Sequence, residues 1–252
     1  VVVHECLADD AALYGLAFFN IFLRSTMGIL APELAVELAL SPGMLGIVAS
    51  SFFISYALMQ IPTGIMLDRF GPRRTVTGLF LLAVVGTALF TVAESGALMV
   101  LARTLMGIGC AAVFAASFMI IGRFYCAVKF TSVAGSLNSF AMQGTQAATL
   151  PLATLVVAYG WRASFAGILL LMGGVTLLAL FNIKDSPKDT SQLTSVRPKE
   201  SFRELIAGLW AVMRTRGVIP IACAGVALSA GNTILGIWGG PYLNDVHGLT
   251  EI

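Results

Sequence analysis

Long apolar runs separated by short polar turns constrain this chain more than any other feature. Two of them, Met44 to Leu67 and Val76 to Ala93, flank a turn with Gly71-Pro72 at its apex. A helix needs about 20 residues to cross the ~30 Å hydrocarbon core of a bilayer, and each run is long enough. A turn this short joins antiparallel neighbours. The runs therefore predict an all-α integral membrane protein.

The composition agrees with a membrane protein and excludes several other classes. Hydrophobic residues make up 58% of the 252 residues, charged residues only 11%, and the mean hydropathy is +0.89. Soluble domains carry about 25% charged residues. The net charge of +2 gives no nucleic-acid footprint. The four cysteines lack C-x-x-C spacing, so no metal site, disulfide framework or other cofactor is expected.

Basic residues indicate the orientation. Of the 15 Lys and Arg residues, all except Arg24, Arg103 and Arg162 fall in segments expected on one side of the membrane. Short loops rich in Lys and Arg stay on the cytoplasmic side. We therefore expect a multi-pass protein of the cell (inner) membrane with a cytoplasmic amino terminus.

The apolar runs also place the membrane helices. We expect them at about residues 11–34, 42–67, 74–93, 97–124, 131–158, 163–183 and 218–243. Ser41 and Pro42 fit the N-cap and the first residue of the second helix. The polar stretch 184–203 mixes both charge signs with Ser, Thr and Pro, as expected for a flexible cytoplasmic linker. Residues 202–212 fit a short amphipathic helix on the membrane surface.

The turn after the second helix carries a charged motif, Gly64-Ile-Met-Leu-Asp68-Arg69-Phe-Gly71-Pro-Arg73-Arg74. It resembles the G-x-x-x-D-R-x-G-R-[RK] signature of the major facilitator superfamily. The run Arg103-x-x-x-Gly107-x-Gly109 resembles the helix-4 motif of the superfamily, and Gly160-Trp161-Arg162 resembles the usual start of its sixth helix. The resemblance implies a fold of two six-helix bundles. The Gly-Pro pair typical of helix 5 in drug/proton antiporters is not present, which weighs against drug export.

An internal repeat supports the two-bundle plan. Pro, Leu, Leu and Ser or Thr recur at the same spacing in Pro32–Ser41 and in Pro241–Thr250, so the last expected helix restarts the pattern of the first. We therefore expect a fragment of a roughly 400-residue transporter with parallel halves. Its parts are a six-helix amino-terminal bundle at 1–183, a cytoplasmic linker at 184–216 and the first helix of the second bundle at 217–252.

Arg24 is the sharpest candidate for function. It lies near the middle of the first expected helix, where a charge costs about 3 kcal/mol or more unless it faces a polar cavity. Asn20, one turn earlier, and Gly28, one turn later, give this helix a polar, open stripe. A guanidinium holds a carboxylate or a phosphate bidentately, so we interpret Arg24 as an anion-binding residue. The alternative is a buried arginine bonded to helix carbonyls or to an acid in the other half.

The spacing from Arg24 to Pro32 also resembles helix 1 of the anion–cation symporters and the organophosphate antiporters. The resemblance implies that Arg24 binds the substrate anion. The antiporters place a second arginine on helix 7, where the repeat puts Thr233 here, so a single arginine favours a carboxylate over a phosphate ester. In the symporters, acids that couple protons are expected near Leu23 and in 110–112. Both places are uncharged here, which puts proton coupling in doubt.

Polar side chains on other expected helices complete the candidate substrate site. Their alternative role is to join helices through hydrogen bonds worth about 0.6 kcal/mol each. Helices 1, 2, 4, 5 and 7 line the cavity of the resembled fold. The predicted substrate-binding residues are therefore Arg24, Asn20, Tyr56, Gln60, Gln143, Gln146, Asn232, Thr233 and Trp238. For Arg103, packing and a place on the substrate pathway are equally supported.

Asp68 is predicted to act in gating. At the inner end of the second helix it can pair with Arg69 or Arg73, or cap a helix of the other half. Such a contact exists only while the inner side is closed, so it would latch one of two states. Gly64, one turn earlier, permits close approach of a partner backbone. An ordinary solvated loop charge is the alternative.

Together these features predict a monomeric carrier in the lipid bilayer that moves a small organic anion by alternating access, driven by an ion or counter-substrate. No nucleotide loop, metal spacing or nucleophile–base set indicates an enzyme. Alternatives are a carrier for a non-anionic solute, a membrane sensor that binds a ligand without transport, and a seven-helix receptor. The receptor is disfavoured because its amino terminus would lie outside.

Overall fold

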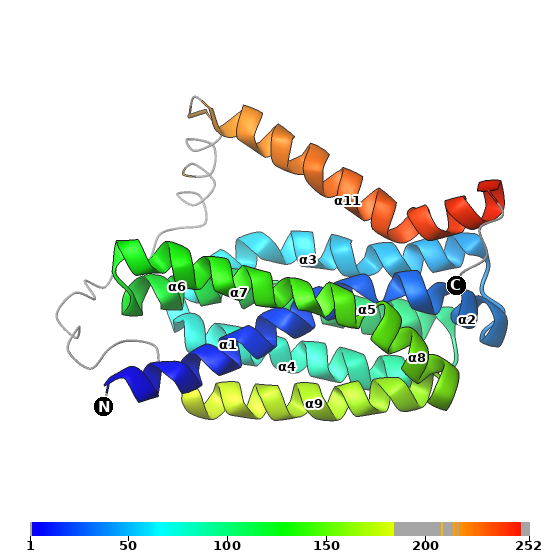
Figure 1. Cartoon of the computed structure of the whole chain (residues 1–252), viewed down its shortest axis with the longest axis horizontal. Coiled ribbons are helices and arrows are strands. Elements are labelled where there is room, and N and C mark those ends of the chain that lie inside the picture. Colours follow the sequence, from blue (N-terminus) through cyan, green and yellow to red (C-terminus); the bar gives the residue numbers. More distant parts are fainter. Residues whose placement is uncertain (1, 184–207, 209–213, 216, 248–252) are drawn as a thin grey trace. The chain divides into compact units, whose positions relative to one another are not determined.

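The computed structural model describes residues 2–183, 208, 214–215 and 217–247, and the regular secondary structure among them is α-helical. The chain divides into two compact units, residues 1–187 and 188–252. In the first unit, long helices pack side by side (Figure 1). The predicted linker at 184–203 lies outside the described residues, as does the predicted amphipathic helix at 202–212 except for Gly208.

The observed helices agree with most of the predicted positions to within a few residues. They are α1 (Val2–Ser25), α2 (Met27–Glu37), α3 (Pro42–Phe70), α4 (Pro72–Thr91), α5 (Gly96–Cys110), α6 (Val113–Phe124), α7 (Ala127–Ala147), α8 (Leu150–Tyr159), α9 (Trp161–Asn182) and α11 (Val218–His247). The predicted cap of α3 is confirmed. The Ser41 hydroxyl accepts the Met44 N–H at 3.2 Å, and Pro42 lies in the first turn.

Several helical stretches meet the length and hydropathy expected of a membrane crossing. Four do so directly, Pro42–Phe70, Pro72–Thr91, Gly96–Phe124 and Val128–Asn182, and the bent pair formed by 11–25 and 27–37 does so jointly. The stretch that starts at Val128 holds 55 residues, about twice what one crossing needs. It turns back at Gly160, where φ is 80°, so that α9 runs back along the bundle, packed against α4 and α1 (Figure 1).

The first membrane helix is broken, which corrects the prediction of one continuous helix at 11–34. α1 ends at Ser25, α2 begins at Met27, and the two are bent by 48°. The Thr26 hydroxyl donates to the carbonyl oxygen of Leu23 at 3.0 Å. Threonine hydroxyls that bond to nearby carbonyls compete with the helical hydrogen-bond ladder. The helix breaks where side chains take over one of its carbonyls.

The fourth and fifth membrane helices are also broken, at 111–112 between α5 and α6 and at 148–149 between α7 and α8. Pro151 lies in the first turn of α8 and has no N–H for the carbonyl four residues earlier, which explains the second break. At the first break, the carbonyl oxygen of Cys110 accepts a hydrogen bond from Asn20 Nδ2 at 2.8 Å.

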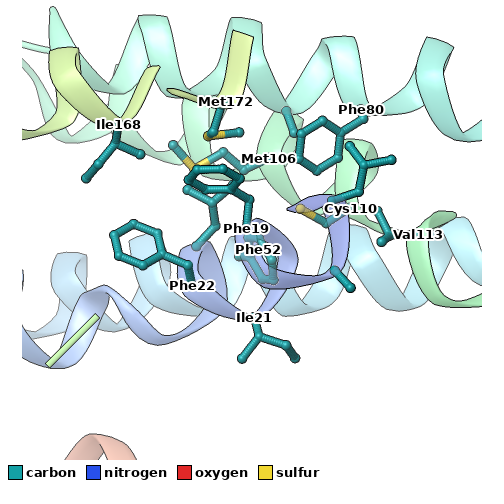
Figure 2. Packing of buried hydrophobic residues seen from close by; sticks show 14 of the residues in the cluster. Phe19, Ile21, Phe22, Phe52, Phe80, Met106, Cys110, Val113, Ile168 and Met172 are labelled. Carbon is teal, nitrogen blue, oxygen red and sulfur yellow. The ribbon is translucent and has the colours of Figure 1, made fainter. Parts of the chain in front are cut away.

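Two glycines of the helix-4 motif let α5 pack closely against its neighbours. A Cβ atom at Gly107 would overlap the backbone of Phe52 in α3, and one at Gly109 would overlap the backbone of Ala83 in α4. Small residues at such crossings allow backbones to touch. Buried side chains, Phe52 and Met106 among them, fill the surrounding space (Figure 2). The motif is therefore a packing surface shared by three helices.

The first residues of α9 hold the far end of α2. Arg162 and Glu37 form an ion pair, and the Trp161 indole N–H also donates to Glu37. Arg162 Nη2 donates to the carbonyl oxygen of Ala93 at 3.0 Å, just beyond α4, and the guanidinium lies 4.3 Å from the Trp161 ring centroid. These contacts join α2, α4 and α9 at one end of the first unit.

Candidate functional site

The candidate site is built on α1 and α3, with Arg24 at its centre. The side chain of Arg24 is exposed, whereas the neighbouring Leu23 is fully buried. The Arg24 guanidinium carbon lies 5.3 Å from the centroid of the Phe53 ring, within the range of a cation–π contact. Arg24 occupies the last turn of α1, where the helix dipole favours a cation. It forms no ion pair within the described part of the chain.

Helix α3 brings two more predicted residues to Arg24. The Tyr56 hydroxyl interacts with the side chains of Gln60 and Asn20, and it lies within electrostatic range of Arg24. Tyr56 is half-buried and Gln60 is exposed. Four predicted substrate residues from two helices thus form one group. We call Asn20, Arg24, Tyr56 and Gln60 the polar cluster.

Asn20 is the member of the polar cluster with a structural contact of its own. Its side chain is 2% exposed, and the bond from Nδ2 to the Cys110 carbonyl joins α1 to the end of α5. A buried amide needs such partners, because an unsatisfied one carries its full desolvation cost. Asn20 is therefore the buried member of the polar cluster, and its hydrogen bond to Cys110 anchors the cluster to α5.

Helix α7 carries Gln143 and Gln146 at the level of Arg24. The hydroxyls of Ser25 and Thr145 lie 3.4 Å apart, and both glutamine side chains are exposed. Among the described contacts, none joins either glutamine to the polar cluster. Their role in substrate binding stays a prediction. So does that of the candidates on α11 in the second unit, which are Asn232, Thr233 and Trp238.

The second intramembrane arginine, Arg103, is 1% exposed. Its Nη1 donates to the carbonyl oxygen of Leu23 at 2.7 Å and lies 3.4 Å from the hydroxyl oxygen of Thr26. Its guanidinium carbon lies 5.4 Å from the centroid of the Phe52 ring. The two polar contacts of Arg103 are with Leu23 and Thr26, where the first membrane helix is broken. They lie in the interior of the first unit.

The predicted gating motif, residues 64–74, covers the end of α3, the turn at Gly71 and the start of α4. Gly71 has a φ of 81°, which glycine adopts without strain. Arg73 Nη2 donates to the Leu180 carbonyl at 2.6 Å near the end of α9. The other charged residues of the motif are exposed: Asp68, Arg69 and Arg74. Asp68 forms no ion pair with any described residue, and a Cβ at Gly64 would meet open space.

Phe53 is a site residue that was not predicted. A signal for it exists in the sequence, because Phe53, Tyr56 and Gln60 are spaced i, i+3 and i+7 and so share one face of α3. An aromatic residue on a membrane helix is otherwise indistinguishable from core packing. In the described part of the chain, no group of three His, Cys, Asp or Glu side chains gathers as metal ligands would.

Several apolar helices long enough to cross a membrane, with close glycine contacts between them, define a multi-pass α-helical membrane protein. The sequence profile of the Major Facilitator Superfamily matches residues 13–252. The chain belongs to this superfamily, whose members are transporters and not enzymes. The predicted family and fold class are confirmed.

Curated relatives carry names of organic-anion transporters. The chain is 31% identical over 197 residues to the "Probable sulfoacetate transporter SauU" of Cupriavidus necator, covering 78% of this chain and 45% of the relative. It is 26% identical over 237 residues to the "Hexuronate transporter" of Bacillus subtilis, covering 92% and 55%. It is 28% identical over 179 residues to the "Probable galactarate/D-glucarate transporter GarP" of Escherichia coli, covering 68% and 40%.

The chain thus spans about half the length of the curated relatives it matches. A crystal structure of an auto-inhibited POT family peptide transporter has a similar fold, with a TM-score of 0.60 and 18% identity over 92% of this chain and 52% of that chain. At this identity the similarity concerns the fold alone.

Proposed function

We propose that the whole protein is a secondary active transporter that moves a small organic anion across the cell membrane by alternating access. The observation that carries the proposal is the exposed guanidinium of Arg24, which has no acidic partner among the described residues and lies beside Phe53 and the polar cluster. An unpaired charge in a membrane protein is costly and marks functional sites. A carboxylate of the substrate would supply the missing partner.

The arrangement favours a carboxylate that also carries hydroxyl groups. Arg24 would bind the carboxylate through two charge-assisted hydrogen bonds, and Tyr56 and Gln60 offer a hydroxyl and an amide for neighbouring polar groups. A phosphate ester concentrates up to two negative charges on one group, and that group would meet the single guanidinium of the polar cluster. Sulfoacetate and galactarate also carry two negative charges, but on two separate groups, so that Arg24 would bind one singly charged carboxylate. The names of the relatives agree, since sulfoacetate, hexuronates and galactarate all contain a carboxylate.

The proposal includes an arrangement of the whole protein. Residues 1–183 would form the amino-terminal six-helix bundle, 184–216 a cytoplasmic linker and 217–252 the first helix of the second bundle. The two bundles would rock about a midplane cavity. The amino terminus would lie in the cytoplasm, and the protein would act as a monomer in the inner membrane. The gradient of an ion or a counter-substrate would drive transport.

Thermal-shift measurements on the purified full-length protein test the substrate class. We expect sulfoacetate, galacturonate or galactarate at 100 times its Kd to stabilise the protein by about 2.7 kcal/mol. Neutral galactose and a sugar phosphate should leave the melting temperature unchanged. Stabilisation by galactose alone would instead support a carrier for a non-anionic solute. Uptake of the stabilising anion into proteoliposomes then separates a transporter from a sensor, which binds without uptake.

Asp68 is proposed to latch the closed inner side. Asp68→Asn should lower the uptake rate between about 5-fold and 150-fold, the usual range for a coupling of 1–3 kcal/mol. The equilibrium affinity for the anion should change less than about twofold, because Asp68 lies at the end of α3 and not in the polar cluster. Glu94→Gln, which removes another exposed carboxylate, is the matched control and should leave both quantities unchanged. Normal turnover in Asp68→Asn would contradict the latch.

A further inference from the structure

Two broken membrane helices are joined at their breaks by a reciprocal pair of side chains. The last carbonyls of a helix have no partner within it. At the end of α1 the Leu23 carbonyl accepts Arg103 Nη1 from α5 at 2.7 Å. At the end of α5 the Cys110 carbonyl accepts Asn20 Nδ2 from α1 at 2.8 Å. Each helix therefore supplies a hydrogen-bond donor to a carbonyl at the end of the other.

We infer that Arg103 is a positioning residue, which holds the first membrane helix bent at Thr26 and thereby sets the direction of Arg24. The carbonyl that Arg103 binds belongs to the peptide bond that joins Leu23 to Arg24. The Leu23 side chain is fully buried, whereas the Arg24 side chain is exposed. A fixed peptide bond at this place fixes the direction in which the next side chain leaves the helix.

The hydrogen bonding of Arg103 is concentrated on this one carbonyl and on Thr26. Its Nε and Nη2 atoms have no hydrogen-bond partner in the described part of the chain, so Nη1 supplies its bonds there. A cation at a helix carboxyl end is favourable because it faces the negative end of the helix dipole. The Phe52 ring, 5.4 Å from the guanidinium carbon, adds a cation–π contact. The hydrogen bonds that Arg103 does form all go to the break of the first membrane helix, so its contribution to the structure is made there.

The bend has a structural consequence beyond Arg24. Helix α2 is tied at its far end by the Glu37 contacts with Trp161 and Arg162, and at its near end by the Thr26 break. Releasing Arg103 would free Leu23 to rejoin a continuous helix. Val36, ten residues beyond Thr26 and 85% exposed, would then move by up to ~12 Å if the bend of 48° straightened fully, given a rise of 1.5 Å per residue. Full straightening would also break the Glu37 contacts, and with those contacts kept the movement would be smaller.

Spin-label distances in the full-length protein test the inference. The labels replace Val36 on α2 and Leu178 on α9, which are both exposed, in a cysteine-free background. Arg103→Gln should shift or broaden the distance distribution by several ångström. Arg103→Lys, which keeps a charged donor, should restore it towards that of the parent. Thr26→Val removes the shared hydroxyl and should give a smaller shift, and it is the informative variant where Arg103→Gln does not fold.

The control is Thr104→Val on α5, whose hydroxyl bonds only to the Val100 carbonyl of its own helix among the contacts described. It should leave the distance unchanged. A parent-like distance in both Arg103→Gln and Thr26→Val, or an equal shift in Thr104→Val, would overturn the inference. The inference rests on the anion role proposed for Arg24, yet the distance needs no ligand. A shifted distance in a protein that no anion stabilises would therefore refute the proposed function and leave the bend at Thr26 explained.

Discussion

Arg24→Gln should lower the affinity for the transported carboxylate by at least about 30-fold. Truncating one partner of a buried, hydrogen-bonded charge pair costs 2–5 kcal/mol or more, and each 1.4 kcal/mol is tenfold in affinity. In the structure nothing else in the polar cluster carries a positive charge, and the Asn20 amide is already bonded to the Cys110 carbonyl. Glutamine is shorter than arginine; it keeps some hydrogen bonding of the side chain but not the charge. The measurement is the dissociation constant of the anion for the purified full-length protein.

Two further variants make the result specific. Arg24→Lys keeps the charge and loses the planar fork that matches a carboxylate, so it should lose about tenfold in affinity, between the parent and Arg24→Gln. Arg123→Gln removes the same unit of charge from the last turn of α6, which contributes no residue to the polar cluster, and should bind like the parent. If all three variants bind the anion with the affinity of the parent, Arg24 has no part in substrate binding.

The membrane helices could be predicted from the sequence because their signal is local. Apolar runs of the required length, the Ser41 cap and the turn residues at Gly71 and Gly160 all act within a few residues of where they occur. Positions and ends of most helices therefore agree with the structure to within a few residues, the first helix excepted. The family assignment had the same basis, since the charged motif is a contiguous string.

The breaks within helices could not be predicted in the same way. The break at Thr26 depends on a hydrogen bond from Arg103, which is 80 positions away from Leu23 in the sequence. Threonine is common inside membrane helices, so Thr26 alone does not indicate a break. Only the three-dimensional structure shows that the Leu23 carbonyl accepts a hydrogen bond from a side chain of α5. The same long-range bond explains why Arg103 could not be assigned a role from sequence.

The members of the polar cluster could be predicted from the sequence, but their contacts with one another could not. Arg24 and Asn20 were predicted from their spacing on one helix, and Tyr56 and Gln60 from theirs on another. The spacing could not show that the two pairs face each other, which the Tyr56 contacts establish. Phe53 was missed because its function depends on the cation above its ring. Gln143 and Gln146 lie at the level of Arg24 along the helices. Whether they reach the substrate depends on the size of the substrate.

The close approach of α7 to α1 at Gly144 places those two glutamines. Gly144→Ala should therefore destabilise the protein measurably. A Cβ atom at this position would overlap the carbonyl oxygen of Phe18 and lie 2.9 Å from the backbone nitrogen of Phe22. Backbone atoms cannot give way as a flexible side chain does, so α7 must move away from α1. Overpacking of this kind costs about 1–3 kcal/mol. For a chain of this size that is a fall of roughly 2–12 °C in melting temperature.

The same helix provides the matched control. Gly135 lies on α7, and a Cβ there would meet no atom within 4 Å, so Gly135→Ala should keep or slightly raise the melting temperature, because alanine is the better helix former. Gly144→Ala should also weaken anion binding, since α7 carries Gln143 and Gln146 away from Arg24, whereas Gly135→Ala should not. Equal melting temperatures for the two variants would mean that α1 and α7 are not in backbone contact at Phe18. In that case the glutamines would lose their assigned place at the level of Arg24.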